Sequence, residues 1–111
     1  MTEIKDPMDS LILELKRGTQ VLGVLSQLKK PLYGYSLVSN LSKRGMDIEK
    51  NTLYPLLRRL EKQNFLESEW NVEESRPRRY YKLSTKGYEV LATLSEEWEK
   101  LNQTIASLLD D

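Results

Sequence analysis

The sequence of 111 residues predicts a mainly α-helical domain that carries a two-stranded β-hairpin and ends in a long helix. Before residue 64, apolar residues recur at steps of three and four, which is the spacing of amphipathic helices. A polar turn over residues 71–77 then separates two short segments of strand character. A regular heptad of apolar residues occupies the C-terminal segment. A chain of this length folds as one domain with a modest core.

The first helix is predicted over Asp9–Lys29, because apolar residues recur along it at helical spacing and Val21 and Val24 widen the stripe. A stripe of this width predicts burial on more than one side. Gly18 interrupts the pattern and weakens the helix locally by about 1 kcal/mol relative to alanine. The helix is expected to end before Pro31, because a residue that precedes proline avoids the helical region.

Two shorter helices follow. The second is predicted over Gly34–Arg44, and Gly45 lies just past it, where a left-handed cap is wanted. The third is predicted over Lys50–Gln63, with Asn64 as its cap. The apolar residues of the third helix share one face and are expected to point inward: Leu53, Leu56, Leu57 and Leu60. The third helix is therefore predicted to be amphipathic.

The hairpin is predicted to pair Phe65–Trp70 with Arg79–Leu83, a segment rich in aromatic residues that favour strands. Side chains alternate between the two faces, with Arg78, Tyr80 and Lys82 on one side and Arg79 and Tyr81 on the other. One of the two tyrosines is expected to pack inward on the third helix. Ser84 is a good N-cap for the last helix, which is predicted to extend to about Leu109.

The last helix carries a heptad seam that is formed by Leu91, Leu94, Trp98, Leu101, Ile105 and Leu108. Seams of this kind usually pack on their own domain. A helix of about 25 residues, however, spans about 37 Å, which is longer than so small a domain can cover. The six seam residues are therefore the predicted dimerisation residues, and the far half of the helix is predicted to pack on a second copy of the chain.

Composition excludes several classes of function. The chain contains no cysteine and no histidine, so it lacks a thiolate and the usual general base. A zinc site would need a shell made only of carboxylates, and neither a metal nor another cofactor is predicted. Four glutamates between residues 67 and 74 have no histidine, cysteine or glycine-rich phosphate loop beside them, so an enzyme is not predicted. No apolar stretch is long enough to span a bilayer and the N-terminus lacks the apolar core of a signal peptide, so the cytoplasm is the expected location.

The net charge is zero, but the charges are not evenly distributed. Basic residues gather in the third helix and in the hairpin, whereas acidic residues dominate the C-terminal segment. The local field, and not the total charge, steers a polyanion toward a surface. Basic runs are also common on ordinary solvated surfaces, and the charge pattern alone leaves both interpretations open.

Three helices followed by a hairpin wing form a winged helix-turn-helix, a unit that places its third helix in a groove of double-stranded DNA. The start of that helix approaches the bases, so Lys50, Asn51 and Thr52 are the predicted base-reading residues. Residues at the helix flanks and in the wing are predicted to contact the DNA backbone: Tyr35, Tyr54, Arg58, Arg76, Arg78 and Arg79. For Tyr54 a second interpretation stays open, because a tyrosine one turn into a helix is as often half-buried as it is in contact with DNA.

Several short segments resemble those of the PadR-like family of bacterial transcription regulators, and they occur in order at matching spacing. They are Pro31-Leu-Tyr-Gly-Tyr35, Thr52-Leu-Tyr-Pro55, Leu60-Glu61, Glu69-Trp70, Arg78-Arg-Tyr-Tyr-Lys-Leu83 and Thr85-Lys-Gly87. The single C-terminal helix resembles that of the small subclass of this family. One departure is Glu49-Lys-Asn51, where the family often has Ser-Pro-Gly, so an operator sequence cannot be transferred from relatives.

The resemblance implies a winged helix-turn-helix DNA-binding domain over residues 1–83 and a dimerisation helix over 84–111, with the first helix also in the dimer interface. It also implies a role for Trp98, because a tryptophan at the matching place lines a pore in multidrug-sensing members and stacks on flat aromatic ligands. Packing of Trp98 within the seam is the alternative.

The predicted function is a homodimeric, sequence-specific DNA-binding regulator. It is predicted to repress at a two-fold-symmetric operator and to be relieved by a planar aromatic or phenolic inducer at the dimer interface. Two alternatives remain at this stage: a winged-helix module that binds proteins, and a repressor that has no small-molecule ligand.

Overall fold

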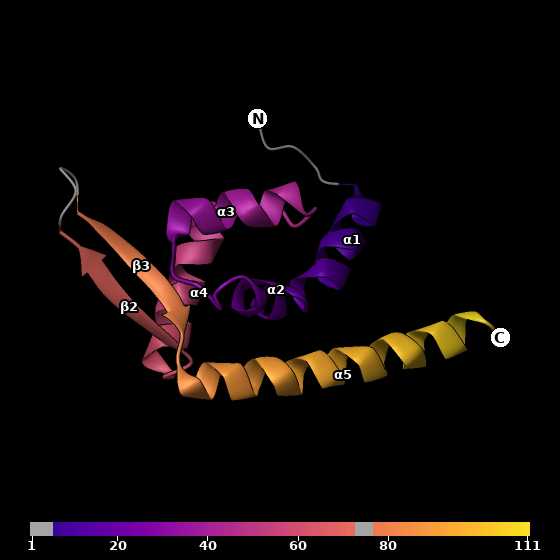
Figure 1. The fold of residues 1–111 in the computed structure, drawn as a ribbon. Coiled ribbons are helices and arrows are strands. Elements are labelled where there is room, and N and C mark those ends of the chain that lie inside the picture. The colour runs from indigo at the N-terminus through magenta and orange to yellow at the C-terminus, as the bar shows by residue number, and fades with distance from the viewer. Residues whose placement is uncertain (1–5, 73–76) are drawn as a thin grey trace.

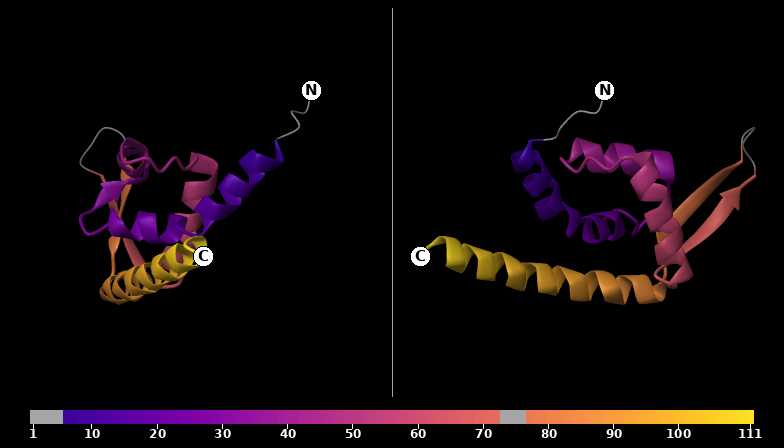
Figure 2. Two further views of the ribbon diagram at one scale, coloured as in Figure 1. Left: turned by 90° about the vertical axis from the view of Figure 1, so that its right-hand side faces the viewer. Right: turned by 180° about the vertical axis from the view of Figure 1, so that it is seen from behind.

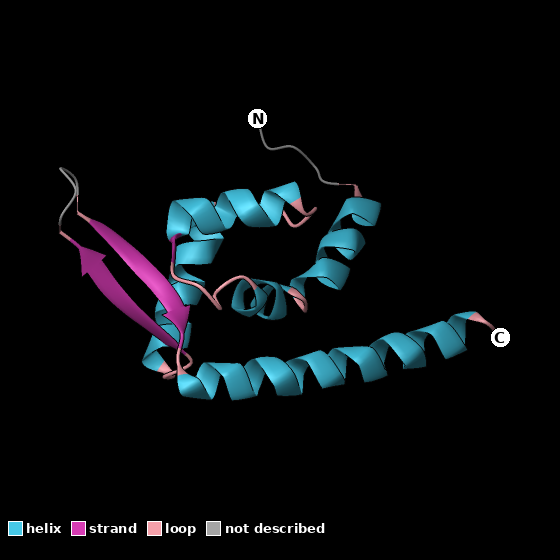
Figure 3. Ribbon diagram, viewed as in Figure 1, coloured by secondary structure: helices cyan, strands magenta, loops and turns pink. Residues whose placement is uncertain are grey.

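A computed structural model describes residues 6–72 and 77–111 of the chain (Figure 1; Figure 3). The elements in order are α1 (Pro7–Arg17), α2 (Gln20–Ser26), β1 (Leu32–Tyr33), α3 (Gly34–Lys43), α4 (Lys50–Lys62), β2 (Leu66–Asn71), β3 (Arg78–Leu83) and α5 (Thr85–Leu109). The predicted winged helix-turn-helix with a long C-terminal helix is thereby confirmed. Among the described residues, no helix combines the length and the low charge that crossing a membrane would require.

The core lies between α2, α3, α4 and the base of the hairpin, and it consists almost entirely of aliphatic side chains. Val24, Leu25, Leu28, Leu53 and Leu57 have no exposed surface. The hairpin projects from one end of this core, and the far half of α5 extends beyond the opposite end (Figure 1; Figure 2). The molecule is therefore elongated, with principal extents of 57 × 44 × 24 Å.

The first helix differs from the prediction, because two helices occupy the segment that was expected to form one. The break lies at Gly18 and Thr19, two residues with low helix propensity. The Thr19 hydroxyl donates a hydrogen bond of 2.7 Å to the carbonyl oxygen of Lys16, which completes the end of α1. Burial on more than one side is also wrong for α1, which has no buried residue, whereas α2 and the residues that follow it enter the core.

The predicted second and third helices are α3 and α4, and both end in the same way. The predicted cap after each helix is confirmed. Gly45 has a φ angle of 98° and Asn64 one of 69°, so each adopts the left-handed conformation that follows a helix. In each case the next residue donates its backbone N–H back into the last turn. Met46 donates to Leu41 at 2.8 Å, and Phe65 donates to Leu60 at 2.9 Å.

The sheet has three antiparallel strands in the order β1-β3-β2, one more than the predicted hairpin. The additional strand β1 has only two residues, too few for an alternating pattern to be recognised. Leu66 pairs with Leu83 at the buried base of the hairpin, and Asn71 pairs with Arg78 at its outer end. This register puts Tyr81 on the inner face, and its exposed fraction of 5% identifies it as the predicted inward tyrosine.

The start of α5 is tied to the core. The Ser84 hydroxyl accepts a hydrogen bond of 3.0 Å from the Gly87 backbone N–H, which confirms the predicted N-cap. Leu91 is buried in the core, and Leu94 packs against it. From residue 95 to the end of the chain every residue is exposed. The first turns of α5 therefore belong to the winged-helix unit, and the rest of the helix has no cover from its own chain.

We predict that Gly87→Ala destabilises the protein by about 1–3 kcal/mol, the cost of forcing extra volume into a packed site. A Cβ atom at Gly87 would lie 2.1 Å from the backbone carbonyl oxygen of Phe65, which cannot move aside without distorting the chain. The free energy of unfolding, measured by urea titration, checks this expectation.

Gly18→Ala is the matched control, because a Cβ atom there would meet nothing within 4 Å and Gly18 already has helical backbone angles. It should be neutral or stabilising by about 0.4–1 kcal/mol, since alanine restricts the unfolded chain. Equal stability of the two variants would contradict the packing described at Gly87.

Candidate nucleic-acid interface

The first turn of α4 points away from the core. Lys50, Asn51 and Thr52 are all exposed, because the next residue, Leu53, is fully buried and sets the orientation of the helix. Glu49 precedes the helix in an extended conformation and makes no side-chain cap hydrogen bond. The predicted base-reading residues therefore share one accessible helix end, beside backbone N–H groups that no side chain caps.

The start of α3 lies next to the start of α4. The Lys50 ammonium is 5.9 Å from the centre of the Tyr35 ring, and Tyr35 itself is 67% exposed. Tyr54 is half-buried and packs against Gly34, where a Cβ atom would lie 2.6 Å from the tyrosine ring. Gly34 therefore allows the second turn of α4 to approach the first turn of α3 closely.

A groove of about 700 Å³ separates these two helix starts from the wing. Its lining residues are Tyr33, Gly34, Tyr35, Tyr54, Trp70, Pro77, Arg78, Arg79 and Tyr81. Most of the side chains are aromatic, and the charged ones are cationic. Such a lining suits a polyanion whose sugars and phosphates follow the groove.

On the outer face of the sheet, tyrosines from β1 and β3 stack on one another. The ring centres of Tyr33 and Tyr80 are 4.0 Å apart with an interplanar angle of 25°, and their hydroxyls are hydrogen-bonded to each other. Asn71 donates to the Tyr80 hydroxyl at 3.2 Å and to that of Tyr33 at 3.4 Å. The Arg78 guanidinium lies 5.1 Å from the Tyr33 ring centre. The outer end of the wing is thereby joined to the strand that leads into α3.

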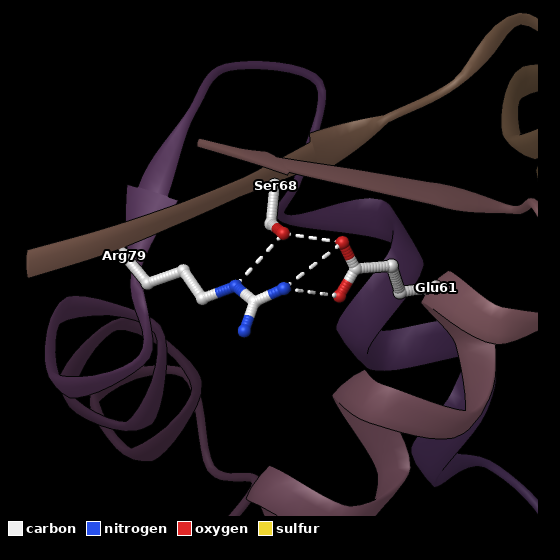
Figure 4. Close-up of polar contacts among 3 residues, drawn as sticks. All are labelled: Glu61, Ser68 and Arg79. Atoms are coloured by element: carbon white, nitrogen blue, oxygen red, sulfur yellow. Dashed lines mark hydrogen bonds and ion pairs between the residues drawn. The ribbon is translucent and has the colours of Figure 1, made fainter. Parts of the chain in front are cut away.

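On the inner face of the sheet, the Arg79 guanidinium bonds to residues of α4 and β2 (Figure 4). It forms an ion pair of 3.0 Å with Glu61 and donates from Nε to the Ser68 hydroxyl at 2.8 Å. The same guanidinium lies within 6 Å of the rings of Trp70 and Tyr81. Burial raises the pKa of the Tyr81 hydroxyl above its ordinary value, and the charge of Arg79 opposes part of that rise.

The structure brings together most of the predicted DNA-contacting residues. Tyr35, Tyr54, Arg78 and Arg79 line the groove, and Lys50 lies beside Tyr35. The exposed side chain of Arg58 is close enough to Tyr81 to act on its pKa. The remaining predicted residue of the wing, Arg76, lies outside the described residues.

Sequence reasoning did not identify Tyr33, Trp70 or Glu61 as part of this surface. Trp70 lies directly opposite Arg79, so the hairpin register would have placed it there. The sequence predicted a turn over residues 71–77 but no register for the two strands, which end at Asn71 and begin at Arg78. Tyr33 belongs to the strand that the sequence did not reveal, and Glu61 meets Arg79 only through the tertiary packing of α4 on the wing.

Comparison with known proteins identifies the family to which a chain with this fold and groove belongs. The family model for the transcriptional regulator PadR-like family matches residues 21–93, which include most of α2, the groove, the wing and the first turns of α5. This protein belongs to the PadR-like family of transcriptional regulators. The expectation of a regulator and not an enzyme is confirmed, because members of this family regulate transcription.

Relatives of this PadR-like protein cover most of its length. A PadR family transcriptional regulator from Eggerthella lenta has a similar crystal structure, with 46% identity, a TM-score of 0.84 and coverage of 92% of this chain and 88% of that one. A PadR-like regulator from Bacillus cereus has 27% identity and a TM-score of 0.78, covering 88% and 98%. A transcriptional regulator from Mycobacterium tuberculosis is 35% identical over 78 residues, 70% of each chain.

Proposed function

We propose that this PadR-like protein is a homodimeric, sequence-specific DNA-binding repressor, released by a planar aromatic or phenolic ligand that binds between the subunits. The observation that carries the proposal is the exposed first turn of α4 beside a groove with aromatic and cationic walls. A polyanion with flat bases matches both the charge and the shape of this surface. The cytoplasm, the location expected from the sequence, is where such a protein would meet its operator.

In this proposal α4 enters the major groove with its first turn. Asn51 hydrogen-bonds an adenine edge, and Lys50 and Thr52 contact the neighbouring bases, because amide and ammonium groups match the donors and acceptors displayed there. The three side chains are exposed and adjacent, so no rearrangement of the helix is needed to bring them to the bases.

The backbone contacts flank that turn. Tyr35 and Tyr54 reach sugar or phosphate oxygens from the walls of the groove, and Arg58 contacts a phosphate from the exposed side of α4. Arg78 holds the next phosphate from the exposed outer end of the wing, and Arg76, beyond the described residues, stays a predicted contact. Arg79 also lines the groove, but its Nε and Nη2 donors bond to Ser68 and Glu61 of the same chain.

A homodimer is supported by α1 and the far half of α5, which lie at the end of the molecule away from the wing (Figure 2) and each carry exposed apolar side chains. On α1 the exposed residues include Met8, Leu11 and Leu15. On α5 they form the far half of the heptad seam: Trp98, Leu101, Ile105 and Leu108, which are between 41% and 67% exposed. Exposed apolar side chains gathered on one helix face suit an interface with another protein chain. Leu91 and Leu94 anchor the seam to its own domain.

Two copies joined through these helices would present two α4 helices to one face of the DNA, with half-sites about one helical turn, roughly 34 Å, apart. Trp98 lies in the exposed seam, so a flat aromatic ligand stacked on it would sit between the subunits. Release of DNA requires that the ligand bind better to a dimer with a different spacing of the two α4 helices.

The DNA-binding proposal predicts that Arg78→Ala weakens binding to all duplexes alike and lowers the slope of log affinity against log salt by about 1, the loss of one phosphate contact. Fluorescence anisotropy with a labelled duplex at several salt concentrations measures both quantities. Arg44→Ala is the matched control, because Arg44 is also exposed but lies at the opposite end of α3 from the groove. The assignment is wrong if both variants behave like the parent protein.

The ligand proposal predicts that some member of a panel of planar aromatic and phenolic compounds quenches tryptophan fluorescence. The chain has two tryptophans, so Trp70→Phe should retain the quenching and Trp98→Phe should abolish it. Absence of quenching across the panel would support a repressor without a small-molecule ligand. Quenching that survives in Trp98→Phe would place the ligand elsewhere.

A further inference from the structure

We propose that Glu61, Ser68 and Arg79 form a brace that sets the angle of the wing relative to the recognition helix α4. Arg79 is then a positioning residue for DNA recognition and not a phosphate contact. The inference rests on the proposed DNA-binding function, which it deepens by assigning a role to an acidic residue beside a basic surface.

The three side chains form a closed ring of hydrogen bonds (Figure 4). Arg79 donates from Nη2 to both carboxylate oxygens of Glu61, at 3.0 and 3.3 Å, and from Nε to the Ser68 hydroxyl at 2.8 Å. The Ser68 hydroxyl in turn donates to Glu61. Each residue comes from a different element: the last turn of α4, the middle of β2 and the outer half of β3.

The wing needs such a connection because its core contacts lie at its base. Leu66 and Leu83 are buried where the hairpin begins, and Tyr81 is the buried residue nearest the tip among the residues that the structure describes. Beyond it, Trp70 and Arg79 face each other on the inner side, and Trp70 is 60% exposed. On the outer face the stacked rings of Tyr33 and Tyr80 join this ribbon to β1, whereas the inner face has no buried contact beyond Tyr81 among the described residues. A two-stranded ribbon is marginally stable without further contacts. The bond from Arg79 to Glu61 ties the outer half of the ribbon to α4.

The Nε and Nη2 donors of Arg79 are directed at Ser68 and Glu61 and not at the groove. Glu61 neutralises its charge at 3.0 Å, and the two side chains are only 40% and 27% exposed. Charge-assisted bonds to a carboxylate are stronger than neutral ones, so a phosphate would have to compete with Glu61 for the charge of this guanidinium. Arg78 is on the opposite face of the same strand, because side chains alternate along it.

The brace and a phosphate contact predict opposite effects for the removal of Glu61. If Arg79 bound phosphate, Glu61→Ala would free the guanidinium, remove a negative charge near the DNA and tighten binding. If the three residues form a brace, the same substitution loosens the wing and weakens binding by about tenfold, the order expected for loss of a charge-assisted network.

Arg79→Lys provides the second variant. Lysine keeps the positive charge but lacks the planar fork that reaches Ser68 and Glu61 together. The brace predicts that Arg79→Lys weakens binding as much as Glu61→Ala, and that the double variant is no weaker than either single one, because the first substitution already opens the ring. A phosphate contact predicts that Arg79→Lys retains most of the affinity.

The experiment measures the affinity of the full chain for a duplex that it has selected from a random-sequence library. Glu67→Ala is the control, because it removes one negative charge, as Glu61→Ala does, without opening the ring. Glu67 belongs to the same strand as Ser68 but lies on the outer face, where it is well exposed and 3.8 Å from Lys82. It should bind as the parent does, or more tightly. Thermal melting should show that all variants remain folded. Unchanged or tighter binding by Glu61→Ala would overturn the brace.

A second measurement needs no DNA. In a Trp98→Phe background, Trp70 is the only tryptophan, and the Arg79 guanidinium lies 5.8 Å from its ring. If the brace holds the guanidinium there, Glu61→Ala should shift the Trp70 emission and increase its quenching by acrylamide, whereas Glu67→Ala should not. No change in Trp70 would overturn the brace even if the parent protein binds DNA. Failure of the parent protein to bind any duplex would instead overturn the proposed function.

Discussion

The burial of one leucine face of α4 is the interaction on which the rest of the structure depends. Leu53 and Leu57 are fully buried, and each such side chain contributes about 1.5–3 kcal/mol when it leaves water. A helix buried along this face has no freedom to rotate, so Lys50 and Asn51 must project outward from its first turn. The same rotation directs Glu61, at the other end of the helix, toward the wing.

The wing takes its orientation from the same core. Leu66 and Leu83 pair at its base and are buried together, and Tyr81 continues the inner face. Because strand side chains alternate, the adjacent residues Arg78 and Arg79 then have different surroundings. Arg78 lies at the exposed outer end of the wing beside the stacked tyrosines, whereas Arg79 is bound to Glu61. Two adjacent arginines therefore suit different roles: Arg78 suits contact with DNA, and Arg79 suits support of the wing.

The helices, their caps and the face of α4 could be predicted because each leaves a local signal, as the leucine spacing, Gly45 and Ser84 show. At Gly18 the sequence predicted only a local weakening of one helix. Helix propensity gives the free-energy cost of a glycine, but it does not show whether the chain changes direction there to pack α1 and α2 separately. The strand β1 and the pairing of Glu61 with Arg79 could not be predicted, because both arise from contacts between segments that are distant in sequence. For the same reason the register that places Trp70 opposite Arg79 became known only from the fold.

We propose that α4 and the wing form one reading unit, which two copies of the chain present together. Selection of duplexes from a random-sequence library, followed by footprinting of the enriched sites, tests this claim most directly. The expected result is an enriched two-fold-symmetric motif, with two protected half-sites on one face of the DNA about 34 Å apart. Absence of enrichment, or protection of a single site without symmetry, would contradict it.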